Sequence, residues 1–401
     1  MTLRGNALVG QSGGPTCVIN QSLVGVIETA VKDPAIDRVL GALHGIRGIL
    51  DERLIDLGLE SMATLETVAT TPCAALRSVR HKPTPEDGAR ALEVLKKHDV
   101  RYFFYIGGND SAETAHLLNE LAVADGYELR LFHVPKTIDN DLRVTDHCPG
   151  YGSAAKFVAQ ALLGDDQDNR SLPGIKIDVI MGRHAGWLTA ASVLARQYPD
   201  AGPHLIYVPE ESFTTAAFLE DVAGMYDRHG RCLVAVSEGI HGPNGETLLE
   251  SAERDSHGNV QLSGSGALGD FLADTVKQGL GGRLSSKLRV RADTFGYLQR
   301  SFAGVWSASD AREAREVGRA AVRIATAGEH PHGSIVIRRV SNQPYEVAIE
   351  RADLADVAKV TRDLDVEFRA GTNDISPAFL DYVRPLVGEL PVMGRLSDLP
   401  V

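Results

Sequence analysis

The sequence contains no apolar stretch long enough to cross a lipid bilayer, which takes about 20 predominantly apolar residues in a helix. The opening residues MTLRGNALVG also lack the basic segment, apolar segment and cleavage site that together mark an export signal. Because both features are missing, we expect a soluble protein that is not exported and has no membrane partner.

Cysteine is scarce, and acidic residues outnumber basic ones. The four cysteines lie far apart and form neither a CxxC pair nor a Cys/His spacing typical of metal ligands. They fit a reducing compartment, so we predict a cytoplasmic protein. The formal net charge is -12, and a chain that repels polyanions as a whole is a poor partner for nucleic acid. Any phosphate binding must therefore be local.

The order of apolar and helical patterns indicates an α/β fold. Short apolar runs alternate with helical patterns, which is typical of a mostly parallel sheet wrapped by helices. At 401 residues the chain is longer than one hydrophobic core usually supports, so we expect two domains with a cleft between them. The expected strands are residues 7–10, 102–106, 129–134, 175–180, 205–208 and 233–236. The expected helices are residues 17–30, 87–97, 111–122, 187–196 and 215–226.

Two glycine-rich motifs stand between an expected strand and an expected helix. In GQSGGPTCVIN, residues 10–20, the glycines let the backbone approach a ligand and the helix start attracts an anion. The motif lacks the spacings of a dinucleotide fold or a P-loop, and an ordinary turn is the alternative. In YIGGNDS, residues 105–111, Asn109 and Asp110 offer oxygen ligands to a hard cation. The alternative is that Asp110 caps the helix, with Glu113 completing a capping box.

The most informative motif is PKTIDNDL, residues 135–142. It brings two carboxylates, an amide, a hydroxyl and a lysine together after an expected strand, which suits a catalytic loop better than a core. An Asx turn could explain Asn140 with either aspartate, but it does not explain Lys136. Two further motifs, MGRHAGWL at 181–188 and GYLQR at 296–300, each place an arginine near a glycine and a ring, which suits a phosphate beside a sugar. We expect Trp187 itself to lie in the core.

Taken in this order, the five motifs resemble the phosphofructokinase family, and PKTIDND with GGND and GYLQR looks like its pyrophosphate-dependent branch. The resemblance covers residues 8–300. It implies a phosphofructokinase fold of two doubly wound α/β domains, between which the chain crosses more than once. We assign residues 1–150 and about 300–340 to a domain that binds the phosphoryl donor. Residues 151–299 and 341–401 form a second domain that binds the sugar phosphate.

The resemblance implies a reaction in which the 1-hydroxyl of fructose 6-phosphate attacks a phosphorus of pyrophosphate, reversibly. Asp139 would be the general base, with support from Lys136, Thr137 and Asp141. An aspartate with an ordinary pKa can serve, because phosphoryl transfer depends mainly on positioning and charge neutralisation. The donor would be bound by Gly13, Gly14, Arg80, Gly108, Asn109, Asp110 and Lys136. The sugar phosphate would be bound by Thr137, Asp139, Met181, Gly182, Arg183, Glu238, Arg291, Tyr297 and Arg300.

Donor choice depends on two positions. ATP-using relatives typically carry glycine where this chain has Asp110 and Lys136. A carboxylate at the first position repels the nucleotide, and an ammonium at the second neutralises the pyrophosphate that is split. Both residues favour pyrophosphate. The cofactor would be Mg²⁺, held by Asp110 or largely by the substrate oxygens, because Asn109 stands where many relatives have aspartate. A second departure is Gly174, where many relatives have a phosphate-binding arginine that nearby Lys176 could replace.

The assembly implied by the resemblance is a homodimer or homotetramer, in which Arg291 reaches a neighbouring subunit. The main alternative function is the same sugar kinase with ATP as donor. A non-catalytic regulatory subunit is an alternative of another class, but it would be expected to lack the base or the arginines that this chain keeps. A dinucleotide-dependent oxidoreductase ranks lower still.

Overall fold

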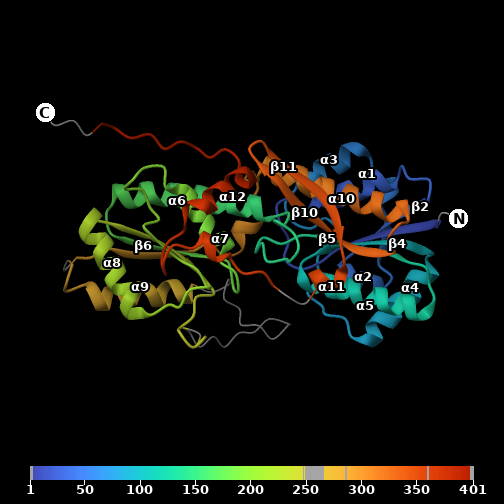
Figure 1. Ribbon diagram of the computed structural model, residues 1–401, viewed down its shortest axis with the longest axis horizontal. Coiled ribbons are helices and arrows are strands. Elements are labelled where there is room, and N and C mark those ends of the chain that lie inside the picture. Colours follow the sequence, from blue (N-terminus) through green and yellow to red (C-terminus); the bar gives the residue numbers. More distant parts are fainter. Residues whose placement is uncertain (1–2, 247, 249–265, 285–286, 359–360, 398–401) are drawn as a thin grey trace. The chain divides into compact units, whose positions relative to one another are not determined.

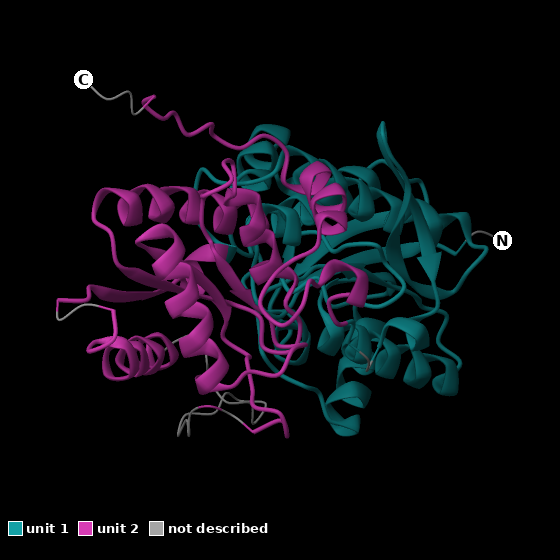
Figure 2. Cartoon of the chain, turned by 60° about the vertical axis from the view of Figure 1, so that its left-hand side comes forward, with its two compact units in different colours: residues 1–154, 253–260, 300–362 teal, residues 155–252, 261–299, 363–401 magenta. Residues whose placement is uncertain are grey.

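The computed structural model describes residues 3–246, 248, 266–284, 287–358 and 361–397. The surface loop expected at 255–266 lies outside this range, apart from Gly266. Contacts divide the described residues into two compact units (Figure 2). Among the described residues, unit 1 comprises 3–154, 300–358 and 361–362, and unit 2 comprises 155–246, 248, 266–284, 287–299 and 363–397. None of the described helices is both long and apolar enough to cross a bilayer.

Unit 1 contains a seven-stranded sheet in the order β11-β10-β5-β4-β1-β2-β3. Its strands are β1 Gly5–Gln11, β2 Ile36–Ala42, β3 Leu54–Asp56, β4 Val100–Gly107, β5 Arg130–Pro135, β10 His332–Asn342 and β11 Tyr345–Ala352. The five central strands are parallel, and β3 and β11 are antiparallel edges. Because central parallel strands are buried on both faces, β4 reads as a nearly continuous apolar run, VRYFFYIG. The carboxyl ends of β5, β4 and β1 therefore lie side by side at one edge of the sheet.

Helices cover both faces of this sheet (Figure 1). One face packs against α1 Ile19–Ala30, α3 Met62–Ala69 and α10 Ala308–Ala327. The other packs against α2 Gly45–Leu50, α4 Pro85–Lys97, α5 Asn109–Asp125 and α11 Leu354–Val357. The sheet is thus doubly wound, as expected, and its loops at the carboxyl edge are left to bind ligands.

Unit 2 contains a smaller sheet of four parallel strands in the order β7-β8-β6-β9. They are β6 Ile175–Ile180, β7 Leu205–Tyr207, β8 Cys232–Ser237 and β9 Val290–Thr294. Its helices are α6 Tyr151–Ser171, which begins in unit 1, α7 Trp187–Ala190, α8 Thr215–His229, α9 Ala267–Leu280 and α12 Pro377–Val387. Trp187 is fully buried against the rings of Phe368, Phe379 and Tyr382, which confirms its assignment to the core.

Every expected strand is present, with bounds that shift by up to a few residues. The helix expected over 187–196 ends early, because α7 passes at Ala190 into a 3₁₀ helix over residues 191–195. The expected domain boundary differs over residues 341–358 and 361–362, which the structure assigns to unit 1. Strand β11 pairs with β10 along its whole length, so this hairpin belongs to the sheet of unit 1.

Helices α1 and α10 touch through glycines. A methyl group on Gly25 would lie 2.1 Å from the Arg315 carbonyl oxygen, and one on Gly318 would lie 2.2 Å from the Ser22 carbonyl oxygen. Both contacts are with backbone, which cannot move aside as a flexible side chain would. These two glycines therefore allow the two helices to approach each other closely on one face of the unit 1 sheet.

We predict that Gly25→Ala lowers the free energy of unfolding of unit 1 by about 3 kcal/mol, because it overpacks this contact. The matched control is Gly224→Ala on α8, where a methyl group meets nothing within 4 Å. That change should raise stability by about 0.5–1 kcal/mol, since alanine favours a helix. Urea unfolding followed by circular dichroism measures both, and equal effects would contradict the packing argument.

Candidate active site

The loops after β1, β4 and β5 meet at the carboxyl edge of the unit 1 sheet. The Lys136 backbone N–H donates to the Gly107 carbonyl (2.9 Å), and the Ser12 N–H donates to the Ile106 carbonyl (2.9 Å). The three motifs GQSGG, GGND and PKTIDND thus become one continuous surface. The first of these loops is about 100 residues from the other two in the sequence, but all three are neighbours in space because β5, β4 and β1 are adjacent in the sheet.

The Lys136 ammonium is buried within this surface. Its Nζ donates to the Gly14 carbonyl oxygen at 2.7 Å, and only 3% of the residue is exposed. A side chain at Gly13 would lie 3.1 Å from the same Nζ, and the φ of 76° at Gly13 also favours glycine. Burial, with the charges of Arg300 and Arg80 adding to it, lowers the pKa of Lys136 to about 8. The ammonium therefore lies in a polar pocket and does not face bulk water.

Two arginines accompany this lysine. Arg300 lies against the glycine loop, since a methyl group on Gly14 would stand 2.9 Å from its Nη1. Arg80 is near enough for its charge to disfavour the Lys136 ammonium. Three like charges repel one another, and an anion with several negative charges relieves that repulsion. The structure thus places Arg300, expected at the sugar phosphate, beside the predicted donor loop as well.

The PKTIDND loop holds its two aspartates through local contacts. The Asp139 N–H donates to the Thr137 hydroxyl at 3.1 Å. Asn140 adopts a left-handed φ of 56°, which asparagine tolerates, and its buried Oδ1 accepts from the Cys148 N–H at 2.9 Å. The Asn140 side chain thus bonds a segment eight residues further on.

The two carboxylates of this loop are coupled. Burial, and next the charge of Asp139, raises the pKa of Asp141 from its ordinary 3.8 to about 7. The Asn109 amide donates to Asp141 Oδ2 at 3.2 Å, which fixes the orientation of that carboxyl group. Two neighbouring carboxylates repel each other when both are ionised, so the pKa of one of them is raised.

The GGND turn opens directly into α5. The helix begins at Asn109 with Gly108 as its N-cap, and Glu113 pairs with Lys82 at 2.6 Å. The alternative that Asp110 caps the helix is therefore wrong. Asp110 instead lies exposed in the first turn. The Asn109 Oδ1 is buried and accepts no hydrogen bond from any residue that the structure describes, so it is a second candidate metal ligand.

Supporting residues around this surface escaped the sequence analysis. Gln11 accepts from the Leu76 N–H (2.8 Å), and Asn20 accepts from the Ala75 N–H (2.9 Å), so the segment leading to Arg80 is fastened to the glycine loop. Both lie within or beside the glycines of GQSGGPTCVIN. Polar residues flanking a glycine loop were the signal that could have identified them.

A buried imidazolium holds the segment that follows the PKTIDND loop. His147 donates from Nδ1 to Asp146 (2.7 Å) and from Nε2 to Glu313 of α10 (2.6 Å). Hydrogen bonds to these two carboxylates outweigh burial and raise the pKa of His147 to about 9. Asp310, also of α10, accepts from the N–H groups of Gly150 and Ser153 at the start of α6. Helix α10 thus holds the segment after the PKTIDND loop through the carboxylates of Glu313 and Asp310.

Unit 2 gathers its own predicted residues at the carboxyl ends of β6 and β8. The Met181 N–H donates to the Gln299 side chain (3.2 Å), and the Gly182 carbonyl accepts from Ser237 (2.5 Å). Glu238 is buried and donates its N–H to the Ile180 carbonyl (2.8 Å). Arg183 is partly buried after this turn, whereas Arg291 on β9 and Tyr297 are exposed. Thr137, Asp139 and Arg300, also predicted to bind the sugar phosphate, belong to unit 1.

Comparison with known proteins identifies the family. A sequence profile described as phosphofructokinase matches residues 6–325. The chain belongs to the phosphofructokinase family. It is 51% identical over 401 residues to the pyrophosphate–fructose 6-phosphate 1-phosphotransferase of Rhodospirillum rubrum, covering 98% of this chain and 97% of that protein. It is 43% identical to the protein of the same name from Xanthomonas campestris pv. campestris, covering 99% and 95%.

Solved structures agree with this assignment. A crystal structure titled pyrophosphate-dependent phosphofructokinase, from Marinobacter aquaeolei, matches with a TM-score of 0.85 and 36% identity, covering 99% of this chain and 95% of that chain. The resemblance to the pyrophosphate-dependent branch of the family is thereby confirmed, as is the fold of two α/β units.

The departure from the family at Gly174 has a structural cause. A methyl group on Gly174 would stand 2.5 Å from the Arg289 carbonyl oxygen, so this position is closed to an arginine without backbone movement. Lys176 does not replace it in this structure. Its ammonium contacts Asp293 and lies 3.4 Å from Asp165. The expectation that Lys176 binds phosphate is therefore not supported.

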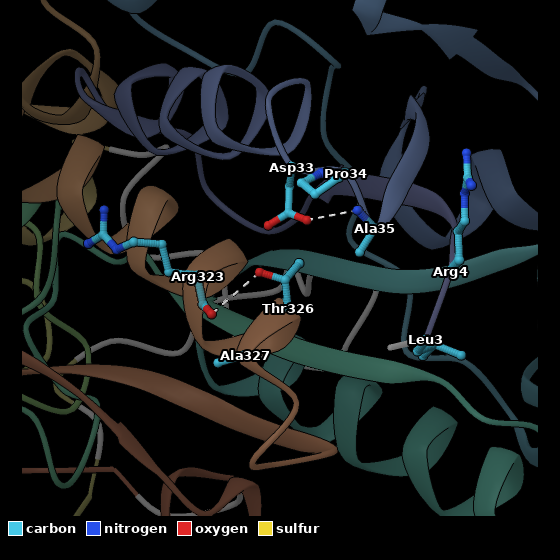
Figure 3. Close-up of a pocket in the computed structure, with 8 residues that line it drawn as sticks. All are labelled: Leu3, Arg4, Asp33, Pro34, Ala35, Arg323, Thr326 and Ala327. Atoms are coloured by element: carbon cyan, nitrogen blue, oxygen red, sulfur yellow. Dashed lines mark hydrogen bonds between the residues drawn. The ribbon is translucent and has the colours of Figure 1, made fainter. Parts of the chain in front are cut away.

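A pocket of about 580 Å³ lies on unit 1 but contains none of the predicted site residues (Figure 3). It is lined by Leu3, Arg4, Asp33, Pro34, Ala35, Arg323, Thr326 and Ala327. Residues 3–4 and 33–35 precede β1 and β2, so the pocket lies at the amino edge of the sheet. Ligands of such sheets bind at the carboxyl edge, where Lys136 lies.

We predict that Asp141→Asn stabilises the folded chain at pH 8 by about 1–3 kcal/mol and changes little at pH 4. The folded-state pKa of about 7 exceeds the ordinary 3.8, so the wild type loses stability as pH rises between these values. Asparagine removes the buried charge and therefore this loss. Urea unfolding at both pH values measures the difference, and the same pH dependence in both proteins would contradict the assignment.

Proposed function

We propose that this chain transfers a phosphoryl group from pyrophosphate to the 1-hydroxyl of fructose 6-phosphate, reversibly, giving fructose 1,6-bisphosphate and phosphate. The observation that carries the proposal is the buried Lys136 ammonium, bonded to the Gly14 carbonyl with Arg300 beside the same loop. Repulsion among these cations disfavours the pocket without a ligand, and a compact polyanion relieves it.

The choice of phosphoryl donor is inferred from Asp110 and Lys136. Asp110 is exposed in the first turn of α5, where its charge opposes the additional phosphate and adenosine of a nucleotide. Lys136 occupies a position where ATP-using relatives typically have glycine. A diphosphate without a nucleoside needs less room and gains more from the ammonium. Pyrophosphate is therefore favoured over ATP.

Asp139 is the proposed base. It takes the proton of the 1-hydroxyl while that oxygen forms its bond to phosphorus, and the bond to the departing phosphate breaks. Burial, and next the charge of Asp139, raises the pKa of Asp141 to about 7, so Asp141 is proposed to support the base as a neighbour that is partly protonated near neutral pH. Thr137 accepts from the Asp139 N–H and so orients the loop.

Mg²⁺ is the proposed metal. The residues present fit a hard cation, because the buried Asn109 Oδ1 lacks a hydrogen-bond donor among the described residues and Asp110 offers a carboxylate one residue later. Both belong to the turn that borders Lys136. A bound Mg²⁺ would neutralise charge on the pyrophosphate oxygens.

Met181, Gly182, Arg183, Glu238 and Tyr297 of unit 2 are proposed to bind the sugar phosphate. Arg300, in unit 1, stays a predicted ligand of the same group. Arg291 is exposed on β9 and is proposed to serve a neighbouring subunit of a homodimer or homotetramer. The proposed compartment is the cytoplasm, which suits the four free cysteines, Cys17, Cys73, Cys148 and Cys232.

We predict that Asp139→Asn lowers kcat roughly 100- to 10,000-fold, the range lost when a general base is removed. The KM for fructose 6-phosphate should change little, because the amide keeps the shape of the loop. A coupled assay with pyrophosphate and Mg²⁺ measures both constants. The control is Asp125→Asn at the exposed end of α5, which should be fully active. Turnover near that of the wild type would place the base elsewhere.

Replacing Asp110 and Lys136 together by glycine should abolish the use of pyrophosphate and allow ATP to be used. The first change removes the repulsion of the nucleotide, and the second removes the charge that binds pyrophosphate. The same assay with either donor measures the switch, and circular dichroism shows whether the variant folds. A wild type that prefers ATP would refute the donor assignment.

A further inference from the structure

Charged residues gather on one face of the unit 2 sheet, and all of them except Arg291 have no role in the proposed reaction. The parallel register of β6 and β9 pairs Lys176 with Arg291 and Asp178 with Asp293. Paired residues of neighbouring strands, and residues two apart on one strand, emerge on the same face. Asp165 of α6 approaches the same cluster, since its carboxylate lies 3.4 Å from Lys176 Nζ.

The cluster has too few cations for its acids. Asp165, Asp178 and Asp293 supply three carboxylates, and one oxygen of each lies within 4.8 Å of the others. A single ammonium, that of Lys176, lies among them. It contacts Asp293 closely, but its Nζ is 3.8 Å from Asp178, beyond hydrogen-bond distance. Formal charges leave two negative charges in excess if Lys176 alone is counted, and one if Arg291 on the same face is included.

Asp178 has the least favourable position. It is fully buried, and neither carboxylate oxygen has a hydrogen-bond partner among the residues that the structure describes. Burial, and next the charge of Asp165, raises the pKa of Asp178 well above its ordinary value. Buried carboxylates are normally paired, hydrogen-bonded or bound to a metal, because an isolated buried charge is strongly unfavourable. Either a proton shared with Asp165 or a bound cation satisfies these oxygens, and the titrations below distinguish the two.

We propose that Asp165, Asp178 and Asp293 form a binding site for a hard divalent cation, which exchanges with the Lys176 ammonium. Carboxylate oxygens are the ligands that such cations prefer. One oxygen of each acid lies within 4.8 Å of the others, close enough for a single ion to contact all three. Ca²⁺ is favoured over Mg²⁺, because Mg²⁺ gives up its bound water reluctantly and rarely binds a site made of protein oxygens alone. This site lies within unit 2, whereas the proposed Mg²⁺ ligands Asn109 and Asp110 belong to unit 1. The inference does not depend on the proposed function.

Calorimetric titration of the metal-stripped full chain with Ca²⁺, without substrates, tests the site. We expect one saturable site in unit 2 that binds Ca²⁺ more tightly than Mg²⁺ in a parallel titration. Asp178→Asn should weaken Ca²⁺ binding about tenfold or more, since it removes a ligand charge but keeps the side-chain shape. The matched control is Asp274→Asn on α9, an exposed acid paired with Lys277, which should bind as the wild type does.

A second variant separates a cation site from a plain ion-pair cluster. Lys176→Met removes the competing ammonium and should tighten Ca²⁺ binding about tenfold or more. A cluster that serves only to hold Lys176 would gain no affinity from this change. The proposal is overturned if neither the wild type nor Lys176→Met binds Ca²⁺ at millimolar concentration. Equal binding by the wild type and Asp178→Asn also overturns it.

Discussion

The buried ammonium of Lys136 imposes the main constraint on unit 1. A cation with 3% exposure, bonded to the Gly14 carbonyl and facing the charges of Arg300 and Arg80, is stable only if the surrounding chain holds it. The carboxylates of Asp139 and Asp141 supply part of that compensation, because both favour the charged lysine. A polyanionic donor would supply the rest. The repulsion among these cations, which is unfavourable without a ligand, thus favours the binding of a diphosphate.

Much of the surrounding structure serves to hold this loop in place. His133 is fully buried and, with a pKa lowered to about 4 chiefly by burial, remains neutral while its Nε2 bonds the Gly107 carbonyl. His147 on the other side remains charged between Asp146 and Glu313. Opposite protonation states of two buried histidines follow from their partners, a carbonyl and a hydroxyl for the first and two carboxylates for the second. Each fixes one end of the segment that carries Lys136 and the two aspartates.

Sequence reasoning succeeded where the signal is local. Period and turn residues located β1, β4, β5, β6, β7 and β8, and the motifs that follow them, because central strands of a parallel sheet are continuously apolar. It failed at β2 and β9, which carry exposed charged residues, and at β11, which was assigned to the second domain although it pairs with β10 of the larger sheet. Polar support was also missed: Gln11 and Asn20 act through hydrogen bonds to a segment more than 50 residues away.

The sequence by itself determined the family, the α/β class and the identity of the loop that carries a lysine and two aspartates. These depend on residue type and spacing along the chain. Only the tertiary structure decided which charges meet. In the folded chain Lys136 is buried and bonds the Gly14 carbonyl, and Asp110 lies in the first turn of α5 and does not cap it. The Lys176 ammonium lies among three carboxylates. Electrostatic interactions act through space, so strand order and register, which no local pattern encodes, set their sign and strength.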